Sequence, residues 1–190
     1  MSAERLIVMD KITDKFVRHF LAVIKTLPPT IGKYSVTKKS IERVQALIED
    51  ALAKGATLAT DHPTSLYAGA TMTRSVVRHL TPEMDLWDTE SFGPCVGIIE
   101  VKDVDEAIRI CNESFYGLSS SIFSRDRAAA ISLAKRMEVG AVHINAATIH
   151  DEPTLPHGGI KDSGFGRFGG RWGVMEWVKT KTVMVHGVPL

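Results

Sequence analysis

Three histidines, His143, His150 and His157, follow one another at intervals of seven residues, and Asp151 and Glu152 lie among them. Histidine is the commonest metal ligand in proteins, and carboxylates can complete a coordination shell. A spacing of seven matches no zinc motif, and a histidine inside an apolar strand more often belongs to the core. We therefore expect no metal site, and a small enzyme built on this histidine cluster remains an alternative hypothesis.

The chain has two cysteines, Cys95 and Cys111. A nucleophilic thiolate needs an electropositive and accessible environment. Cys95 instead follows Pro94 and enters an apolar strand, while Cys111 falls in a predicted helix. Both are expected to be small buried hydrophobic side chains. Catalysis by Cys95 stays a second alternative, and no Gly-x-Ser-x-Gly motif indicates a serine hydrolase.

The glycines at 164, 166 and 169 match the Gly-x-Gly-x-x-Gly pattern of dinucleotide-binding loops. That pattern binds a pyrophosphate only where a strand runs into the glycine turn and a helix starts from it. Here a polar loop precedes the glycines. We interpret them as residues of tight turns, which need positive φ or a close backbone approach.

Helices that could position these residues are indicated by apolar periodicity and by capping signals. One stripe is formed by Ile12, Phe16, Phe20, Ile24 and Leu27, and Pro28-Pro29 ends it. A second is formed by Ile41, Val44, Ile48 and Leu52, with Gly55 at the C-terminal cap. Asp103 is expected to cap a third helix, with Glu106 accepting from the N–H of Asp103 itself. Asp126 is expected to cap a fourth, which runs to about Glu138 and is followed by Gly140.

Strands alternate with these helices. They are expected at 6–9, 96–101, 120–123 and 141–144, and a loop with an edge strand at 60–75. This alternation favours an α/β fold, in which one domain contains a parallel sheet with helices on its faces. The stretch 145–173 has seven glycines and two prolines and is expected to form a long ordered loop. A short helix around 174–178 and a β-prone segment at 182–185 follow it.

The composition narrows the functional class only a little. The 190 residues include 23 basic and 22 acidic side chains, for a net charge of +1, so we expect no nucleic acid and no anionic membrane as partner. No apolar run is long enough to cross a bilayer. Two cysteines cannot form a disulfide framework and suit a reducing compartment. A cytoplasmic location is the expectation.

Four stretches of the sequence resemble one known family. They are 1–8 (Met-Ser-Ala-Glu-Arg-Leu-Ile-Val), 90–94 (Glu-Ser-Phe-Gly-Pro), 112–119 (Asn-Glu-Ser-Phe-Tyr-Gly-Leu-Ser) and the stretch from 143 through 170. Together they resemble the C-terminal part of an aldehyde dehydrogenase, in the branch of the salicylaldehyde and vanillin dehydrogenases. The resemblance covers nearly the whole chain, with some shortening between Pro28 and Val36. It implies a parallel-sheet catalytic domain, truncated at its N-terminus, over 1–180 and an oligomerisation tail strand over 181–190.

The resemblance also implies roles for particular residues. Glu90 and Phe92 match the positions that hold the nicotinamide ribose and ring, so the cofactor is expected to be NAD or NADP. Ile149, His150 and His157 match the wall of the substrate pocket. An imidazole at position 157, where many members carry phenylalanine, would suit a phenolic aldehyde. Asn145 is expected to tie down the loop rather than to contact substrate.

Catalytic residues are not expected within the chain. The nucleophilic cysteine of the family directly precedes the Met-Ser-x-Glu-Arg run, and the general-base glutamate and the nucleotide-binding domain come from earlier segments. The resemblance therefore implies NAD(P)-dependent oxidation of an aromatic aldehyde to its acid, and we expect these 190 residues alone to be inactive and to bind the cofactor poorly. The alternative is a non-catalytic module that pairs with full-length relatives, as a homo-oligomer or hetero-oligomer, through the tail strand.

Overall fold

The computed structural model describes residues 3–28, 37–60, 67–68 and 71–187. Met1 and Ser2 of the opening run, most of the shortened stretch after Pro28, part of the predicted 60–75 loop and the last three tail residues lie outside these ranges. The chain divides into two compact units, Met1–Ser114 and Phe115–Leu190, and each has its own sheets and helices. The expected division into a domain at 1–180 and a tail at 181–190 stays a prediction.

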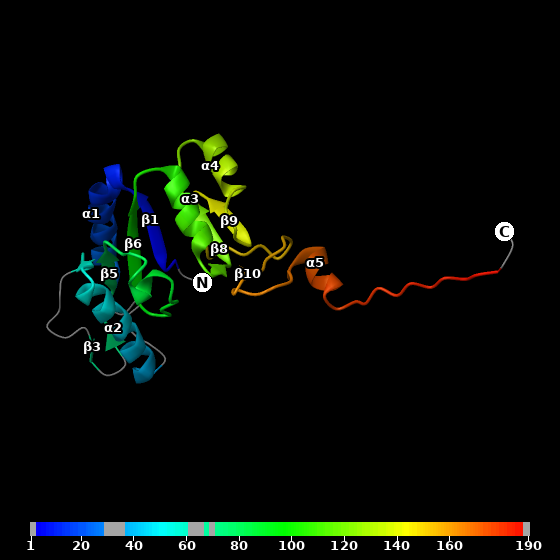
Figure 1. Cartoon of the computed structure of the whole chain (residues 1–190), viewed down its shortest axis with the longest axis horizontal. Helices are drawn as coiled ribbons and strands as arrows, with labels where there is room; N and C mark the ends of the chain where they lie inside the picture. The colour runs from blue at the N-terminus through cyan, green and yellow to red at the C-terminus, as the bar shows by residue number, and fades with distance from the viewer. Residues whose placement is uncertain (1–2, 29–36, 61–66, 69–70, 188–190) are drawn as a thin grey trace. The chain divides into compact units, whose positions relative to one another are not determined.

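The first unit contains a four-stranded sheet in the order β1-β6-β5-β2, of which Figure 1 labels β1, β6 and β5. Its strands are β1 (Arg5–Met9), β2 (Thr57–Leu58), β5 (Ser75–Arg78) and β6 (Cys95–Val101). The central strand β6 runs parallel to both β1 and β5, and only the two-residue β2 is antiparallel. The predicted parallel core is thus confirmed, with the expected strands at 6–9 and 96–101 each extended by one residue.

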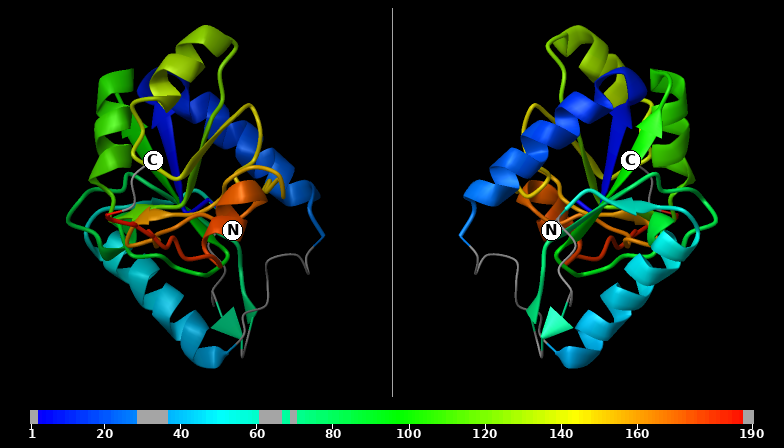
Figure 2. Two further views of the ribbon diagram at one scale, coloured as in Figure 1. Left: turned by 90° about the vertical axis from the view of Figure 1, so that its right-hand side faces the viewer. Right: turned by 90° about the vertical axis from the view of Figure 1, so that its left-hand side faces the viewer.

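Helices cover the two faces of this sheet (Figure 2). They are α1 (Asp10–Thr26), α2 (Lys38–Ala53) and α3 (Val104–Glu113), accompanied by the 3-10 helix η1 (Asp85–Trp87) and the short pair β3 (Tyr67–Ala68) and β4 (Thr71–Met72). Successive strand residues point to opposite faces, so Val76 and Ile98 pack with α1 whereas Val77 and Ile99 pack with α2. Among the described residues, no helix is both long and apolar enough to cross a bilayer.

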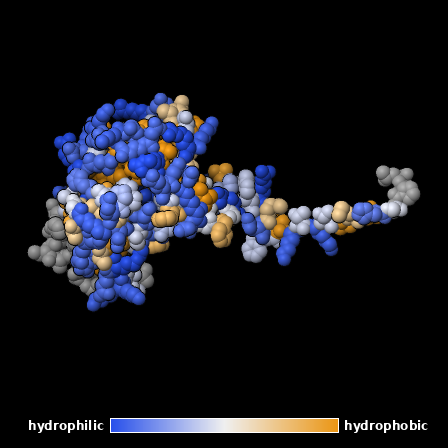
Figure 3. Space-filling view, viewed as in Figure 1, coloured by the Kyte–Doolittle hydropathy of each residue, from blue (hydrophilic) through white to orange (hydrophobic). Residues whose placement is uncertain are grey.

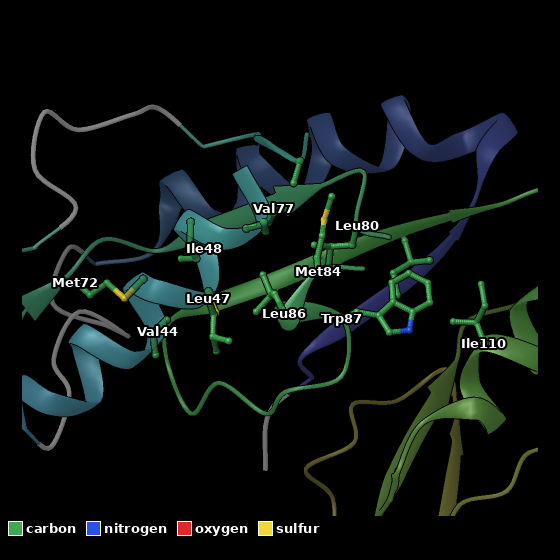
Figure 4. Close-up of a cluster of buried hydrophobic side chains, with 14 of the residues drawn as sticks. Val44, Leu47, Ile48, Met72, Val77, Leu80, Met84, Leu86, Trp87 and Ile110 are labelled. Atoms are coloured by element: carbon green, nitrogen blue, oxygen red, sulfur yellow. The ribbon is translucent and has the colours of Figure 1, made fainter. Parts of the chain in front are cut away.

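The larger core lies between the sheet, α2, α3 and η1 (Figure 4). Ile41, Val44 and Ile48, three of the four predicted positions on α2, are at most 2% exposed there. Burying one such side chain contributes about 1.5–3 kcal/mol, so this face of α2 anchors the unit. Gly55 follows the end of α2 with φ of 103°, which confirms its predicted place at the helix C-terminus.

The buried face of α1 differs from the predicted stripe. Thr13 and Val17 are buried, whereas Ile12 is 53% exposed and Leu27 is 38% exposed. The Thr13 hydroxyl donates to the carbonyl of Met9 at 3.0 Å, so this polar side chain can enter the core without losing a hydrogen bond. Phe16, Phe20 and Ile24 of the predicted stripe do pack against the core, so the apolar spacing located the helix and most of its buried face, and only Ile12 and Leu27 were misplaced.

The second unit contains two small sheets and two short helices. Its elements are β7 (Tyr116–Gly117), β8 (Ser119–Ile122), α4 (Arg127–Ala134), β9 (Ala141–Ile144), β10 (Ile160–Lys161) and α5 (Gly170–Met175). Strands β8 and β9 are parallel, whereas β7 and β10 are antiparallel. The β9 range matches its prediction, but α4 ends four residues before Glu138 and α5 begins four residues before 174. The segment 182–185 forms no strand within the described part of the chain.

Two helix caps test the predicted local chemistry. Asp126 accepts from the N–H of Ala129 at 2.9 Å, and Asp103 accepts from the N–H of Glu106 at 2.8 Å, so both N-terminal caps are confirmed. The Glu106 carboxylate, however, accepts from the N–H of Lys102 at 2.8 Å rather than from Asp103. The reciprocal bond therefore forms one residue earlier than predicted.

Candidate functional site

The loop 88–94 joins η1 to β6 and contains both residues expected to contact the cofactor. The 3-10 helix η1 that precedes it is held to α2, because the Asp50 carboxylate accepts from the N–H of Asp85 at 2.9 Å. Lys54 lies 2.6 Å from the same carboxylate. The hydrogen bond from Lys54, followed by that from Asp85, lowers the pKa of Asp50, so Asp50 stays ionised at neutral pH. The loop thus follows a short helix that is attached to α2.

Arg43 of α2 holds the middle of this loop. Its guanidinium donates to the carbonyl of Ser91 at 3.1 Å and also to the carbonyl of Glu90. Arginine presents several donors in a rigid fork, so one side chain can bind two successive carbonyls. Sequence reasoning missed Arg43, because its partners lie 47 and 48 residues further along the chain and no local pattern links them.

Ser91 is the buried polar residue of the loop, with 1% of its surface exposed. Its hydroxyl donates to the Glu4 carboxylate at 2.6 Å and accepts from the N–H of Gly93 at 3.1 Å. The N–H of Ser91 also donates to Glu4, at 3.3 Å. Glu4 belongs to the opening run, and the sequence offers no signal for a bond that spans 87 residues.

Glu90 and Phe92 lie on either side of this anchored serine. Phe92 has φ of 52°, a left-handed conformation that is uncommon for residues other than glycine, and is 75% exposed. Glu90 is half-buried, and no hydrogen bond or ion pair to its carboxylate is formed by the described residues. The loop therefore presents an open aromatic face and an available carboxylate, which suits a ribose with hydroxyl donors and a planar ring.

Cys95 begins β6 at the end of the same loop and is 7% exposed. Burial raises the pKa of its thiol to about 11, the Glu4 charge adds to this increase, and a hydrogen bond with Ser91 opposes it. Cys111, on α3, is 9% exposed. Both cysteines are buried as predicted, and burial with a raised pKa argues against Cys95 as the nucleophile, since the thiolate is the attacking form.

In the second unit, Ile149 and His150 lie on an exposed segment. Ile149 is 65% exposed, and the His150 side chain is 67% exposed. The His150 ring meets the His143 ring edge-on with centroids 6.5 Å apart, and its Nε2 lies 3.7 Å from a carboxylate oxygen of Glu152. Among the described residues, the buried Nε2 of His143 has no hydrogen-bond partner. The segment thus exposes the apolar side chain of Ile149 and the imidazole ring of His150.

His157, the third residue expected in the pocket wall, is buried rather than exposed. Its main chain forms two 2.8 Å hydrogen bonds with Phe168, and their rings lie 5.1 Å apart. Its Nδ1 is 3.7 Å from a carboxylate oxygen of Asp151. In the part of the chain that the structure describes, no group of three or more His, Cys, Asp or Glu side chains is arranged to hold a metal ion.

Small polar side chains hold the segment after β9. Asn145, with φ of 57°, accepts from the N–H of Ser124 and donates to its carbonyl, both at 2.9 Å, which confirms its predicted structural role. Ser121 and Ser119 lie on one face of β8 and donate to the carbonyls of Ala146 and Thr148. The two serines were not singled out from the sequence, because short hydroxyl side chains in a strand are too common to be informative.

The glycine pattern forms turns, as interpreted. Gly164, Gly166 and Gly169 all have positive φ, and a Cβ on Gly169 would lie 2.2 Å from the carbonyl oxygen of Leu155. The N–H of Gly170 is already bound to the carbonyl of Pro153 at 2.8 Å. Helix α5 has only six residues; Gly169 allows a close backbone approach, whereas Gly164 and Gly166 provide positive φ in the turns.

Comparison with known proteins identifies a family and several relatives for this chain. A family model described as "Aldehyde dehydrogenase family" matches residues 1–183. The salicylaldehyde dehydrogenase of Pseudomonas putida is 39% identical over 194 residues, covering 98% of this chain and 40% of that protein. The vanillin dehydrogenase of Pseudomonas fluorescens is 36% identical over 196 residues, covering 100% and 40%. The chain thus spans about 40% of the length of these curated relatives.

Solved structures give the same result. The salicylaldehyde dehydrogenase of Pseudomonas putida G7, complexed with salicylaldehyde, matches with a TM-score of 0.85 and 38% identity, covering 91% of this chain and 37% of that chain. The succinic semialdehyde dehydrogenase of Streptococcus pyogenes, in complex with NADP+, matches with a TM-score of 0.86 and 31% identity, covering 96% and 41%. The resemblance and the fold class expected from the sequence are confirmed.

Proposed function

The chain belongs to the aldehyde dehydrogenase family, and from that premise we propose that it carries part of an NAD(P)-dependent aldehyde dehydrogenase. Its proposed contribution is the surface that holds the nicotinamide ribose and ring, together with one wall of the aldehyde pocket. The observation that carries the proposal is the loop 88–94. There the exposed Phe92 ring and the Glu90 carboxylate, which no described residue binds, flank the buried Ser91.

The residues of this loop fit the nicotinamide nucleotide. A carboxylate that no described side chain occupies can accept from ribose hydroxyls, and an exposed aromatic side chain offers an apolar face to the ring. When bound, the nicotinamide supplies the acceptor for the hydride that leaves the substrate. Glu90 orients the ribose and Phe92 keeps water from one side of the ring, so the chain contributes orientation rather than a reacting atom.

The proposed substrate is an aromatic aldehyde. Support comes from the salicylaldehyde and vanillin dehydrogenases among the relatives and from Ile149, which is apolar and exposed. The exposed His150 adds an imidazole group that can accept a hydrogen bond from a ring hydroxyl or donate one to it, whereas His157 is buried. The nucleophile is not supplied by these residues, because both cysteines are buried and the pKa of Cys95 is raised to about 11. We therefore propose that the 190-residue chain alone does not oxidise aldehydes.

A direct test of the cofactor surface is the Glu90→Gln variant. Saturation-transfer NMR on the 190-residue chain would report contact with the ribose and nicotinamide protons of NAD and NADP, even for weak binding. Glu90→Gln should reduce the ribose signals and weaken the affinity about tenfold, since a hydrogen bond to a charged group contributes about 1.5–3 kcal/mol. Glu42→Gln, a change at an exposed carboxylate of α2, is the matched control. Equal signals from parent and Glu90→Gln would contradict the role of Glu90.

The second candidate function is a non-catalytic module that associates with full-length relatives or with other copies of this chain. The observation that favours it is the segment around Val183, Met184 and Val185, whose side chains are 75%, 74% and 77% exposed. Hydrophobic side chains are visible along this C-terminal segment in Figure 3. A β-prone segment without a strand partner can be satisfied by pairing with another sheet edge. A cytoplasmic location belongs to both proposals.

A further inference from the structure

Phe92 has a backbone conformation that its neighbours must maintain. Its φ of 52° is unfavourable for a side chain with a Cβ, and its exposed ring has little packing to compensate. Such conformations persist only where the surrounding structure over-determines them, and they cluster at functional sites. The bonds that hold the residues on either side of Phe92 therefore matter for the site.

Ser91 is the centre of these bonds. Its hydroxyl and its N–H both donate to the Glu4 carboxylate, at 2.6 Å and 3.3 Å, and the N–H of Gly93 donates to the same hydroxyl at 3.1 Å. Arg43 binds the Ser91 carbonyl from the other side. The residue before Phe92 and the residue after it are thus both fixed through one buried side chain.

Glu4 is itself fixed by the central strand. Its carbonyl accepts from the N–H of Gly97 in β6 at 2.9 Å, and the next residue, Arg5, starts β1. Arg5 also pairs with Asp88, at the start of the loop, at 3.5 Å. Glu4 thus joins the start of β1 to the middle of the loop that precedes β6.

We propose that Glu4 is a positioning residue for the cofactor. Through Ser91 it holds Glu90 and Phe92 in the arrangement that binds the nicotinamide nucleotide. The inference rests on the proposed function and deepens it, because it names the residue that fixes the loop 88–94 relative to the start of β1.

Variants of Glu4 and Ser91 separate positioning from simple stabilisation. Glu4→Ala should lower the affinity of the 190-residue chain for NAD and NADP about tenfold, as expected for losing a charge-assisted hydrogen bond. Glu4→Gln keeps an acceptor oxygen and should stay within about threefold of the parent. Ser91→Ala should match Glu4→Ala. The double variant should be no weaker than either single variant, because both remove one interaction.

Glu106→Ala is the matched control. It also removes a carboxylate that accepts from a main-chain N–H of the first unit, that of Lys102 at 2.8 Å. Its unfolding midpoint should fall by an amount similar to that of Glu4→Ala, while its cofactor affinity stays unchanged. A role of Glu4 in stability alone would instead leave the cofactor affinity of folded Glu4→Ala equal to that of the control.

The possible results are distinct. Parent-like affinity in folded Glu4→Ala or Ser91→Ala overturns the inference and leaves the proposed function standing. If Glu4→Ala does not fold, Ser91→Ala and Glu4→Gln decide by the same affinity criterion. No saturation transfer from NAD or NADP to the parent chain would overturn the proposed cofactor surface, and the inference with it.

Discussion

At the scale of single residues, burial decides which side chains can act. Cys95 and Ser91 are both nearly inaccessible, yet Ser91 binds Arg43, Glu4 and Gly93 and organises a loop, whereas burial leaves the Cys95 thiol protonated. The sequence predicted the burial of Cys95 from the apolar strand that follows it. It could not predict the role of Ser91, because Glu4 becomes its neighbour only after β1 pairs with β6.

The raised pKa of Cys95 predicts a specific dependence of stability on pH. The pKa is raised from 9.0 to about 11 in the folded chain, so above pH 9.0 the unfolded thiol loses its proton while the folded thiol keeps it. The unfolded state then binds fewer protons, and the free energy of unfolding should fall as the pH rises from 9.0 towards about 11. Urea unfolding across this range would measure the slope.

Cys95→Ala should remove this part of the slope, because no titrating thiol remains at that position. Cys111→Ala is the matched control and should retain it, since Cys95 is unchanged. An identical pH dependence in the parent and in Cys95→Ala would show that the thiol is not the group responsible.

At the scale of helices and strands, the sequence predicted helix caps reliably but predicted the buried face of a helix less well. The caps at Asp103 and Asp126 depend on neighbours within three residues, and both form as predicted. The side of α1 that meets the sheet depends on distant strands: Phe16, Phe20 and Ile24 pack there as predicted, but Thr13 and Val17 are the buried residues and Ile12 is exposed. Capping needs only the local chain, whereas packing needs the tertiary fold.

At this scale, the prediction concerns association through the C-terminal tail. Removing residues 181–190 should convert an associated form of the protein into a monomer, because the exposed 182–185 segment is proposed to pair as an edge strand with another sheet. Analytical ultracentrifugation of the parent and the shortened chain would give their masses. Replacing Val183 and Val185 by lysine, which leaves the backbone intact but charges one face of the strand, should weaken association less than deletion does.

Association that survives the deletion would rule out the tail as the interface. A parent chain that is monomeric at all concentrations would contradict association with other copies of this chain, and association with a full-length relative would then have to be measured with that relative present.

At the scale of the whole molecule, the sequence predicted the α/β class and the parallel core, because strand and helix patterns alternate along the chain. A single domain over 1–180 stays a prediction, and the chain divides into two compact units between Ser114 and Phe115. The candidate site was located from the resemblance at Glu90 and Phe92. The side chains that support it, Arg43, Glu4 and Ser91, required the fold, since they lie far apart in the sequence.

Aldehyde oxidation by the purified 190-residue chain bears most directly on the proposed function. Salicylaldehyde or vanillin would be supplied with NAD or NADP, and formation of the reduced nicotinamide would be followed. We predict no turnover, with saturation transfer still detected at the cofactor, because the described residues include Glu90 and Phe92 but no accessible thiol. Turnover by the parent chain would contradict this prediction, and turnover that persists in Cys95→Ala and Cys111→Ala would show that the chemistry comes from groups to which we assign no catalytic role.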